Sequence, residues 1–375
     1  MYTRKYYNPN NFNAVHASVA YLAFWGMWLA VSLIISALAY AAGNFDFWLL
    51  NCFSTILLSA GLFLLTLLFS LSARVHPLNG GGFLIRKGCG TEILMTFVLV
   101  FGFASLLIPL SESFSVAGTY ISEAVSGPIQ PGGGSGLEID MDGSVGWMLL
   151  YTFIFVPLLP AIFEELLFRG VILRGFLQFG KVPAVVLSSL MFAMAHGSYQ
   201  QFIYQFLLAL VIGFLVLETK NLFVGMVAHF ANNFFASWGM LPTAMAMSWD
   251  GDGLPVYTAI VSLMQFLIGA VCVVAAVVYF GKRLLHMQKN PERSCGDVRA
   301  AFVVGDMVSG SLLEEKPWYD CGALTPKGME RRQFLRGDAA RGRLNGKAGN
   351  VASFILIGVG LLIAVIVFIT SFLAV

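Results

Sequence analysis

The chain has 375 residues, of which 58% are hydrophobic and only 11% are charged, whereas roughly 25% of the residues in a soluble domain are charged. This composition excludes an ordinary soluble globular protein and predicts an all-α fold, that of a polytopic membrane protein. The net charge of +2 gives no indication of nucleic-acid binding, which is typical of strongly basic surfaces.

About nine apolar stretches are long enough to cross the roughly 30 Å hydrocarbon core of a bilayer, which takes about 20 helical residues. We expect transmembrane helices near residues 15–42, 47–73, 91–110, 147–172, 183–197, 199–218, 221–239, 257–281 and 351–375. The first stretch exceeds the roughly 7–15 apolar residues of a signal peptide and therefore favours a spanning helix.

The basic residues indicate how these helices are oriented. If the chain starts in the cytoplasm and crosses nine times, all 22 Lys and Arg residues lie on or near the cytoplasmic side. The segments on the other side contain Asp and Glu but no Lys or Arg, as the positive-inside rule requires. We therefore expect an integral membrane protein, in a bacterial cell membrane, with its N-terminus in the cytoplasm and its C-terminus outside.

The chain divides into one membrane domain and its polar extensions. We expect a cytoplasmic tail at 1–14, a membrane domain at 15–281, a basic cytoplasmic loop at 282–350 and a C-terminal transmembrane helix at 351–375. The basic loop has the composition of a segment that lies on an anionic membrane surface. On the outer side, the loop at 111–146 is rich in Gly and Pro, which disfavours any regular element.

Three ionisable side chains stand inside the apolar run that extends from Trp147 to Val171: Glu164, Glu165 and Arg169. An ionised side chain deep in a bilayer costs at least roughly 2.5–3.5 kcal/mol, so it is kept where it faces water or a partner and commonly marks a functional site. Glu165 and Arg169 stand at i and i+4 in the favourable order for an ion pair. Glu164 is about 100° round the helix and remains available for another role. A purely structural alternative is an ion pair that only locks helices together.

Two of the five histidines, His196 and His229, also fall within predicted membrane helices. Phe192 and His196 share one helix face at i and i+4, and His229 and Asn233 share another. A polar side chain in a membrane lacks water as a substitute partner, which raises the expectation of a functional role. Together with the acidic pair, these residues are the candidate site.

The three polar runs resemble the motifs of a known family. Glu164-Glu165-Leu166-Leu167-Phe168-Arg169, Phe192-Ala193-Met194-Ala195-His196 and His229-Phe230-Ala231-Asn232-Asn233 match, in order and spacing, EExxxR, FxxxH and HxxxN of the CAAX protease and bacteriocin-processing family. That family includes the type II CAAX prenyl endopeptidases. The resemblance covers about residues 147–239.

The resemblance implies an intramembrane endopeptidase that acts on a membrane-anchored peptide or protein. It implies that Glu164 and His196 activate water, and that His229 and Asn233 donate hydrogen bonds to the tetrahedral oxyanion. Glu165 then has a supporting role with Arg169. Such roles are chemically sound, because a carboxylate and an imidazole can act together as a general base.

The expected topology places Glu164 and His196 at different depths. Glu164 comes late in a helix that runs inwards, whereas His196 ends a helix that runs outwards. Either a tilted helix, or a fourth helix that continues past Arg174, would bring the two side chains to one level. The prolines at 157 and 160, which disturb the same helix, could leave room for a wet cavity.

Three alternatives remain open. Glu164, His196 and His229 could hold a catalytic zinc ion, since two His and one Glu form a known zinc set. We favour a mechanism without metal, because the chain has no HExxH motif and Asn is not a usual zinc ligand. Glu164, Arg169 and His196 could instead form the relay of a proton- or ion-coupled transporter, or the chain could be a catalytically silent immunity or scaffold member of the family.

Overall fold

The computed structural model describes residues 12–42, 46–73, 89–126, 145–219, 221–247, 254–289 and 347–373. Within these ranges all regular structure is helical. Seven helices are long and apolar enough to cross a membrane, and two shorter apolar helices cover Lys181–Ala195 and Leu222–Ser237. The prediction of an all-α, polytopic membrane protein is confirmed. The count of nine spanning helices is not confirmed, because two of the nine expected stretches coincide with the shorter helices.

Most of the described helices are single continuous elements. They are α1 (Ala14–Ala42), α2 (Phe47–Ala73), α3 (Cys89–Ser126), α7 (Lys181–Ala195), α8 (Tyr199–Thr219), α9 (Leu222–Met247), α10 (Leu254–Lys289) and α13 (Lys347–Leu373). Between α3 and α7 lies a composite helical element. It consists of α4 (Val145–Leu150), the π-helical η2 (Tyr151–Phe155), α5 (Val156–Leu167), the π-helical η3 (Phe168–Ile172), α6 (Leu173–Phe176) and the 3₁₀ turn η4 (Leu177–Phe179).

The expectation that the 111–146 loop forms no regular element is wrong for its first part, because α3 continues to Ser126. Pro109 lies inside this helix without ending it. One turn later the hydroxyl of Ser113 donates to the Pro109 carbonyl at 2.7 Å, which satisfies a backbone acceptor at an exposed position. The run of Gly and Pro that motivated the expectation starts at 127 and lies outside the described residues, as does most of the 282–350 loop.

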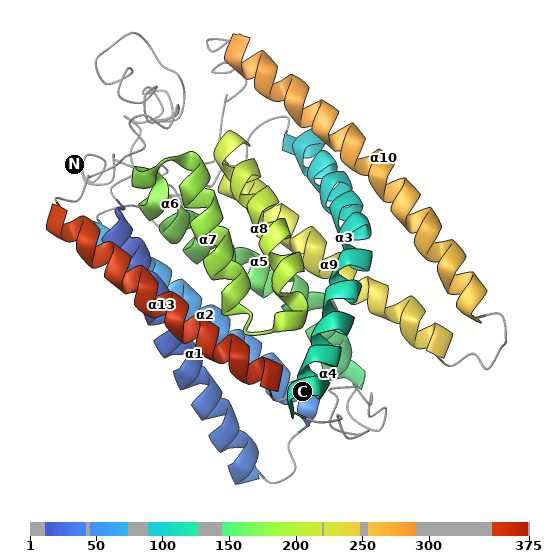
Figure 1. Ribbon diagram of the computed structural model, residues 1–375, viewed down its shortest axis with the longest axis horizontal. Coiled ribbons are helices and arrows are strands. Elements are labelled where there is room, and N and C mark those ends of the chain that lie inside the picture. The colour runs from blue at the N-terminus through green and yellow to red at the C-terminus, as the bar shows by residue number, and fades with distance from the viewer. Residues whose placement is uncertain are drawn as a thin grey trace.

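The element α5 lies at the centre of the bundle. Helices α1, α2 and α13 pack on one side of it, α9, α3 and α10 lie on the other, and α7 and α8 pack together across it (Figure 1). Two apolar clusters fill these contacts, one around α1, α7 and α13 and one around α3, α8 and α9. Phe163 of α5 packs against both clusters. The polar residues of α5 are therefore enclosed by protein and not by lipid.

One end of the bundle brings together the helix ends that the basic residues assign to the cytoplasm. The backbone N–H of Ala14 donates to the Gln178 side chain at 3.2 Å, and Gln178 donates to Asn350 at 3.1 Å. Near the same end, Glu92 at the start of α3 pairs with Arg283 at the end of α10. The helices therefore alternate in direction as the sequence predicts.

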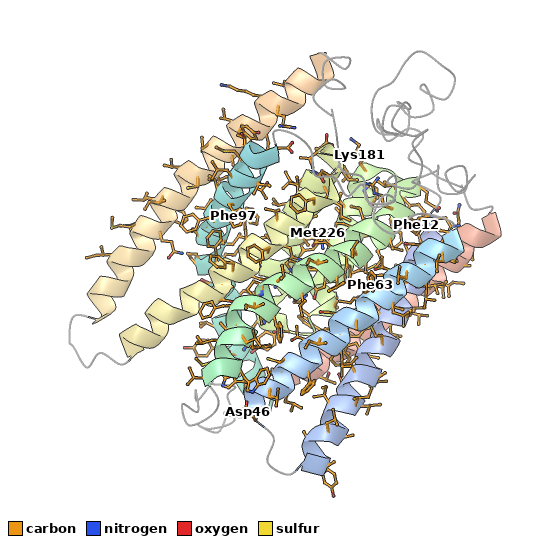
Figure 2. The ribbon with its side chains drawn as sticks, turned by 180° about the vertical axis from the view of Figure 1, so that it is seen from behind. Phe12, Asp46, Phe63, Phe97, Lys181 and Met226 are labelled. Atoms are coloured by element: carbon orange, nitrogen blue, oxygen red, sulfur yellow. The ribbon has the colours of Figure 1, made fainter. Side chains whose placement is uncertain are left out.

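The opposite end brings together the start of α2 and the start of the composite element. The thiol of Cys52 lies 3.9 Å from the Trp147 carbonyl, and the rings of Trp48 and Tyr151 are 5.9 Å apart. Asp46 lies at this end of the bundle and Lys181 at the other (Figure 2).

The fourth predicted helix is longer than expected. The composite element continues past Arg174 to Phe179, and α7 starts only two residues later. Glu164 is consequently near the middle of this element, so the predicted difference in depth from His196 disappears. The π-helical turns η2 and η3 flank α5, and such turns are found where a helix is strained or functional.

The sidedness of the two long loops can be tested with single-cysteine variants. We predict that Cys295 and an engineered Ser135→Cys, both outside the described residues, lie on opposite sides of the membrane. An impermeant maleimide added to intact cells should label Ser135→Cys, and it should label Cys295 only after permeabilisation. Labelling of both positions from one side would contradict the topology.

Candidate functional site

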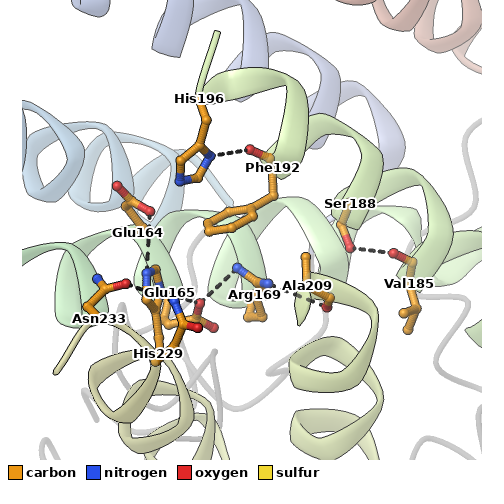
Figure 3. A network of polar contacts seen from close by, with 11 residues as sticks. Glu164, Glu165, Arg169, Val185, Ser188, Phe192, His196, Ala209, His229 and Asn233 are labelled. Atoms are coloured by element: carbon orange, nitrogen blue, oxygen red, sulfur yellow. Dashed lines mark hydrogen bonds and ion pairs between the residues drawn. The ribbon is translucent and has the colours of Figure 1, made fainter. Parts of the chain in front are cut away.

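The buried carboxylate of Glu165 connects three helical segments. Its Oε1 accepts a hydrogen bond from the Arg169 Nη1 at 2.8 Å and another from the His229 Nδ1 at 2.9 Å (Figure 3). The side chains of Glu165 and Arg169 are 0% and 1% exposed, so the expected i, i+4 ion pair is present and dry. Since His229 belongs to α9, this carboxylate joins α9 to the composite element.

Arg169 extends the connection to two further helices. Its Nη2 donates to the Ala209 carbonyl of α8 at 3.5 Å, and its guanidinium carbon lies 4.4 Å from the ring centroid of Phe192 on α7. A guanidinium over an aromatic face is attracted by the ring quadrupole, an effect that grows when both groups are desolvated. Arg169 thus helps to place α7 and α8 relative to Glu165.

The approach of α9 to Glu165 depends on Gly225, one turn before His229. A Cβ atom at Gly225 would lie 2.5 Å from a methyl carbon of Val216 and 3.2 Å from the Glu165 Oε2. Both distances are shorter than ordinary van der Waals contact. A larger residue would push α9 away from α8 and lengthen the His229–Glu165 hydrogen bond.

Glu164, unlike Glu165, forms no ion pair with Arg169. Its Oε2 lies 3.9 Å from the His229 Nε2, and its side chain is 16% exposed. In the described part of the chain this oxygen is buried without a hydrogen-bond partner, as is the Oε2 of Glu165. The side chain of Glu165, however, is 0% exposed. A buried carboxylate oxygen without a donor is costly, so the position beside Glu164 is suited to a water molecule or a substrate group that donates a hydrogen.

His196 ends α7 with its ring turned toward Glu164 (Figure 3). Its Nδ1 is 2.9 Å from the Phe192 carbonyl, and because a carbonyl can only accept, Nδ1 carries the hydrogen. The Nε2 of a neutral His196 is then a hydrogen-bond acceptor. The same reasoning holds for His229, whose Nδ1 donates to the ionised Glu165, so both histidines have only Nε2 available for the site.

Phe192 separates the polar groups by packing among them. Its ring centroid lies 4.8 Å from that of His196 and 5.6 Å from that of His229, both edge-on, while Arg169 covers its face. The ring is almost fully buried. It therefore keeps the guanidinium and the two imidazoles apart and limits how each ring can turn.

Asn233, one turn after His229 on α9, is held by a backbone carbonyl. In an α-helix the Val156 carbonyl would accept the N–H of residue 160, but Pro160 has none. The Asn233 Nδ2 donates to this carbonyl at 3.2 Å, and its Oδ1 accepts from Asn232 at 3.1 Å. The amide of Asn233 therefore has one N–H left over.

Comparison with known proteins gives one match. Residues 146–235 match the family model described as "Type II CAAX prenyl endopeptidase Rce1-like", close to the range of 147–239 expected from the three motifs. This part of the chain is therefore similar to a type II CAAX prenyl endopeptidase. We refer to residues 146–235 below as the CAAX-protease domain. A search of curated proteins and a search of solved structures each found nothing that matches the chain.

The CAAX-protease domain covers about a quarter of the chain and contains every candidate site residue. Of the helices outside the domain, α1, α2, α3 and α13 pack against it, and α10 packs against α3.

Two polar residues of the domain were missed by the sequence reasoning. Asn232 is 3% exposed and donates to Asn233, while the hydroxyl of Tyr204 on α8 donates to the Oδ1 of Asn232. A Tyr in an apolar helix is common enough to attract no notice. The signal that could have found Asn232 is its position beside Asn233, in a helix that is otherwise apolar.

The zinc alternative was tested against the geometry of the CAAX-protease domain. Glu164, His196 and His229 have suitable donor atoms, with Nε2 of both histidines available. However, among the described residues no group of three or more His, Cys, Asp or Glu side chains is close enough to hold a metal ion. The residues as placed do not fit zinc, and no step is derived through a metal.

The neighbouring carboxylates offer a matched test of the Glu165 connection. We predict that Glu165→Gln lowers the free energy of unfolding by about 3–5 kcal/mol, because it leaves Arg169 buried without its charged partner. Glu164→Gln makes the same chemical change one residue away and should cost much less. Reversible unfolding of each variant in mixed micelles measures the difference. Equal losses for the two variants would contradict the account.

Proposed function

We propose that the protein is an intramembrane endopeptidase that hydrolyses a peptide bond in a membrane-anchored peptide or protein. The observation that carries the proposal is the free, buried oxygen of Glu164, which lies next to the His229 imidazole and faces the ring of His196. A carboxylate in this setting can accept a proton from a water molecule.

In the proposed reaction, Glu164 and His196 hold the attacking water. Glu164 removes one proton as the water oxygen attacks the scissile carbonyl, and the Nε2 of His196 accepts the hydrogen bond from the second. The proton held by Glu164 then passes to the leaving amine nitrogen as the C–N bond breaks. Atoms and charges balance, because the water gives its O–H to the new carboxylic acid and its other hydrogen to the new amine, and Glu164 ends in its starting form.

Asn233 and His229 are the proposed donors to the tetrahedral oxyanion. Asn233 has one free N–H after its bond to Val156. His229 can donate from Nε2 only as an imidazolium, because Nδ1 already donates to Glu165. His229 thus gives the oxyanion a charged donor and Asn233 a neutral one.

Removal of a single reacting group tests these roles. We predict that Glu164→Gln abolishes cleavage, because an amide keeps the shape of the carboxylate but cannot accept the proton. His196→Ala and His229→Ala should also abolish it, and Asn233→Ala should lower kcat by about 10²–10³, the usual cost of one oxyanion donor. The assay is hydrolysis of an internally quenched, farnesylated CAAX peptide by protein in liposomes.

The natural substrate can be sought in parallel without assuming its chemistry. Membrane proteomes of cells carrying wild type or Glu164→Gln should differ in the termini of the substrate proteins. Thermal unfolding of each variant serves as the folding control. If peptide and proteomes show no difference, while liposomes pass protons or a solute only when Glu164 is intact, the protein is a transporter and the proposal is wrong.

The role of metal needs its own measurement. We predict that purified protein contains no stoichiometric metal and that chelators leave its activity unchanged, because Asn233 acts here through N–H groups and not as a ligand. Elemental analysis before and after chelation decides the matter. One zinc ion per chain, lost together with activity and restored together with it, would overturn the mechanism without metal.

A further inference from the structure

A chain of side-chain hydrogen bonds runs from α8 through α9 to α5 and ends at the Val156 carbonyl. Its members are Tyr204, Asn232 and Asn233. Neither Tyr204 nor Asn232 belongs to the motifs that identify the domain.

The direction of this chain is fixed by chemistry. The Val156 carbonyl can only accept, so Asn233 must turn an N–H toward it. The Oδ1 of Asn233 then points at Asn232, and Asn232 must donate one of its side-chain N–H groups to it. The Oδ1 of Asn232 is left for Tyr204, whose hydroxyl donates to it. Each amide therefore has one favoured orientation of its oxygen and nitrogen.

The origin of this order is Pro160. Because Pro160 has no N–H, the Val156 carbonyl loses its normal helical donor and becomes the acceptor that starts the sequence of bonds. Reversal of the Asn233 amide would place two oxygens against each other at Val156 and two N–H groups against each other at Asn232. In a buried site each such clash leaves polar groups unsatisfied, which is costly.

We propose that Tyr204 and Asn232 are positioning residues that keep the Asn233 amide in the orientation in which its free N–H can reach the oxyanion. This inference rests on the proposed function, in which Asn233 is an oxyanion donor. Neither residue touches the reacting atoms. Both act by holding a neutral amide, which could otherwise turn over, in a single orientation.

Two nearly isosteric variants test the proposal with little change in packing. Tyr204→Phe removes only the hydroxyl at the far end of the chain. Asn232→Asp keeps the acceptor for Tyr204 but replaces the N–H group that Asn233 needs with an oxygen. The matched control is Tyr279→Phe, which removes the hydroxyl that accepts from Arg283 on α10, away from the site.

The measurement is kcat and KM for the quenched farnesylated peptide, with thermal unfolding of each variant alongside. We expect Tyr204→Phe to lower kcat about tenfold, the equivalent of one hydrogen bond. Asn232→Asp should approach the loss of Asn233→Ala, about 10²–10³. KM should stay near wild type in both, and Tyr279→Phe should change neither constant.

The outcomes separate this inference from the proposed function. If wild type cleaves and Asn233→Ala does not, but Tyr204→Phe and Asn232→Asp retain the kcat of wild type, the inference is wrong and the function stands. If kcat falls only in proportion to the folded fraction, the two residues are merely structural and the inference is also wrong. If wild type cleaves no peptide, and its membrane proteome does not differ from that of Glu164→Gln, the proposed function fails and the inference fails with it.

Discussion

The arrangement of the site depends on one buried oxygen, the Oε1 of Glu165, which receives both Arg169 and His229. An ion pair without water is favourable only when its geometry is good and its remaining groups are bonded. Arg169 has such additional contacts to α7 and α8, whereas the Oε2 of Glu165 has no hydrogen-bond partner among the described residues. The hydrogen bond from His229 to Glu165 fixes the position of α9, and Gly225 leaves the space for α9 to come this close.

A second connection between α5 and α9 involves no charged group. It forms because Pro160 has no N–H to donate to the Val156 carbonyl. Pro160 leaves the Val156 carbonyl open, and Asn233 fills it. The two connections hold successive turns of α9, at His229 and at Asn233. Glu164, which takes part in neither, retains a free oxygen toward the site. Of the two carboxylates, Glu165 joins the helices, and Glu164 is the one to which we assign the proposed chemistry.

Sequence reasoning could find the charged residues because charge in an apolar helix is conspicuous and because i, i+4 spacing is a local property. It correctly predicted the Glu165–Arg169 pair, the helical fold and the family. It could not show that His229 bonds to Glu165, because that contact joins residues 64 positions apart and depends on how α5 and α9 cross. The extension of α3 beyond residue 110 was missed because a Gly- and Pro-rich run further on dominated the composition of the presumed loop.

Hydrogen-bond direction was also out of reach of the sequence. A proline in a helix predicts a carbonyl without its helical donor. Only the packing of the helices shows which side chain donates a hydrogen bond to that carbonyl. Asn233 could be placed on the face of His229, whereas its orientation depends on Tyr204 and Asn232, residues on two different helices. The roles of Glu164, His196, His229 and Asn233 in catalysis remain predictions, as does independence from metal.

The central claim is that water, activated at Glu164, splits a peptide bond within the membrane. The most direct measurement is to incubate liposomes that contain the protein with the farnesylated peptide in ¹⁸O-labelled water and to determine the masses of the products by mass spectrometry. Wild type should give two fragments, with one heavy oxygen in the new carboxylate, and Glu164→Gln should give none. Full-length peptide from wild-type liposomes, together with a solute flux that Glu164→Gln abolishes, would contradict the claim.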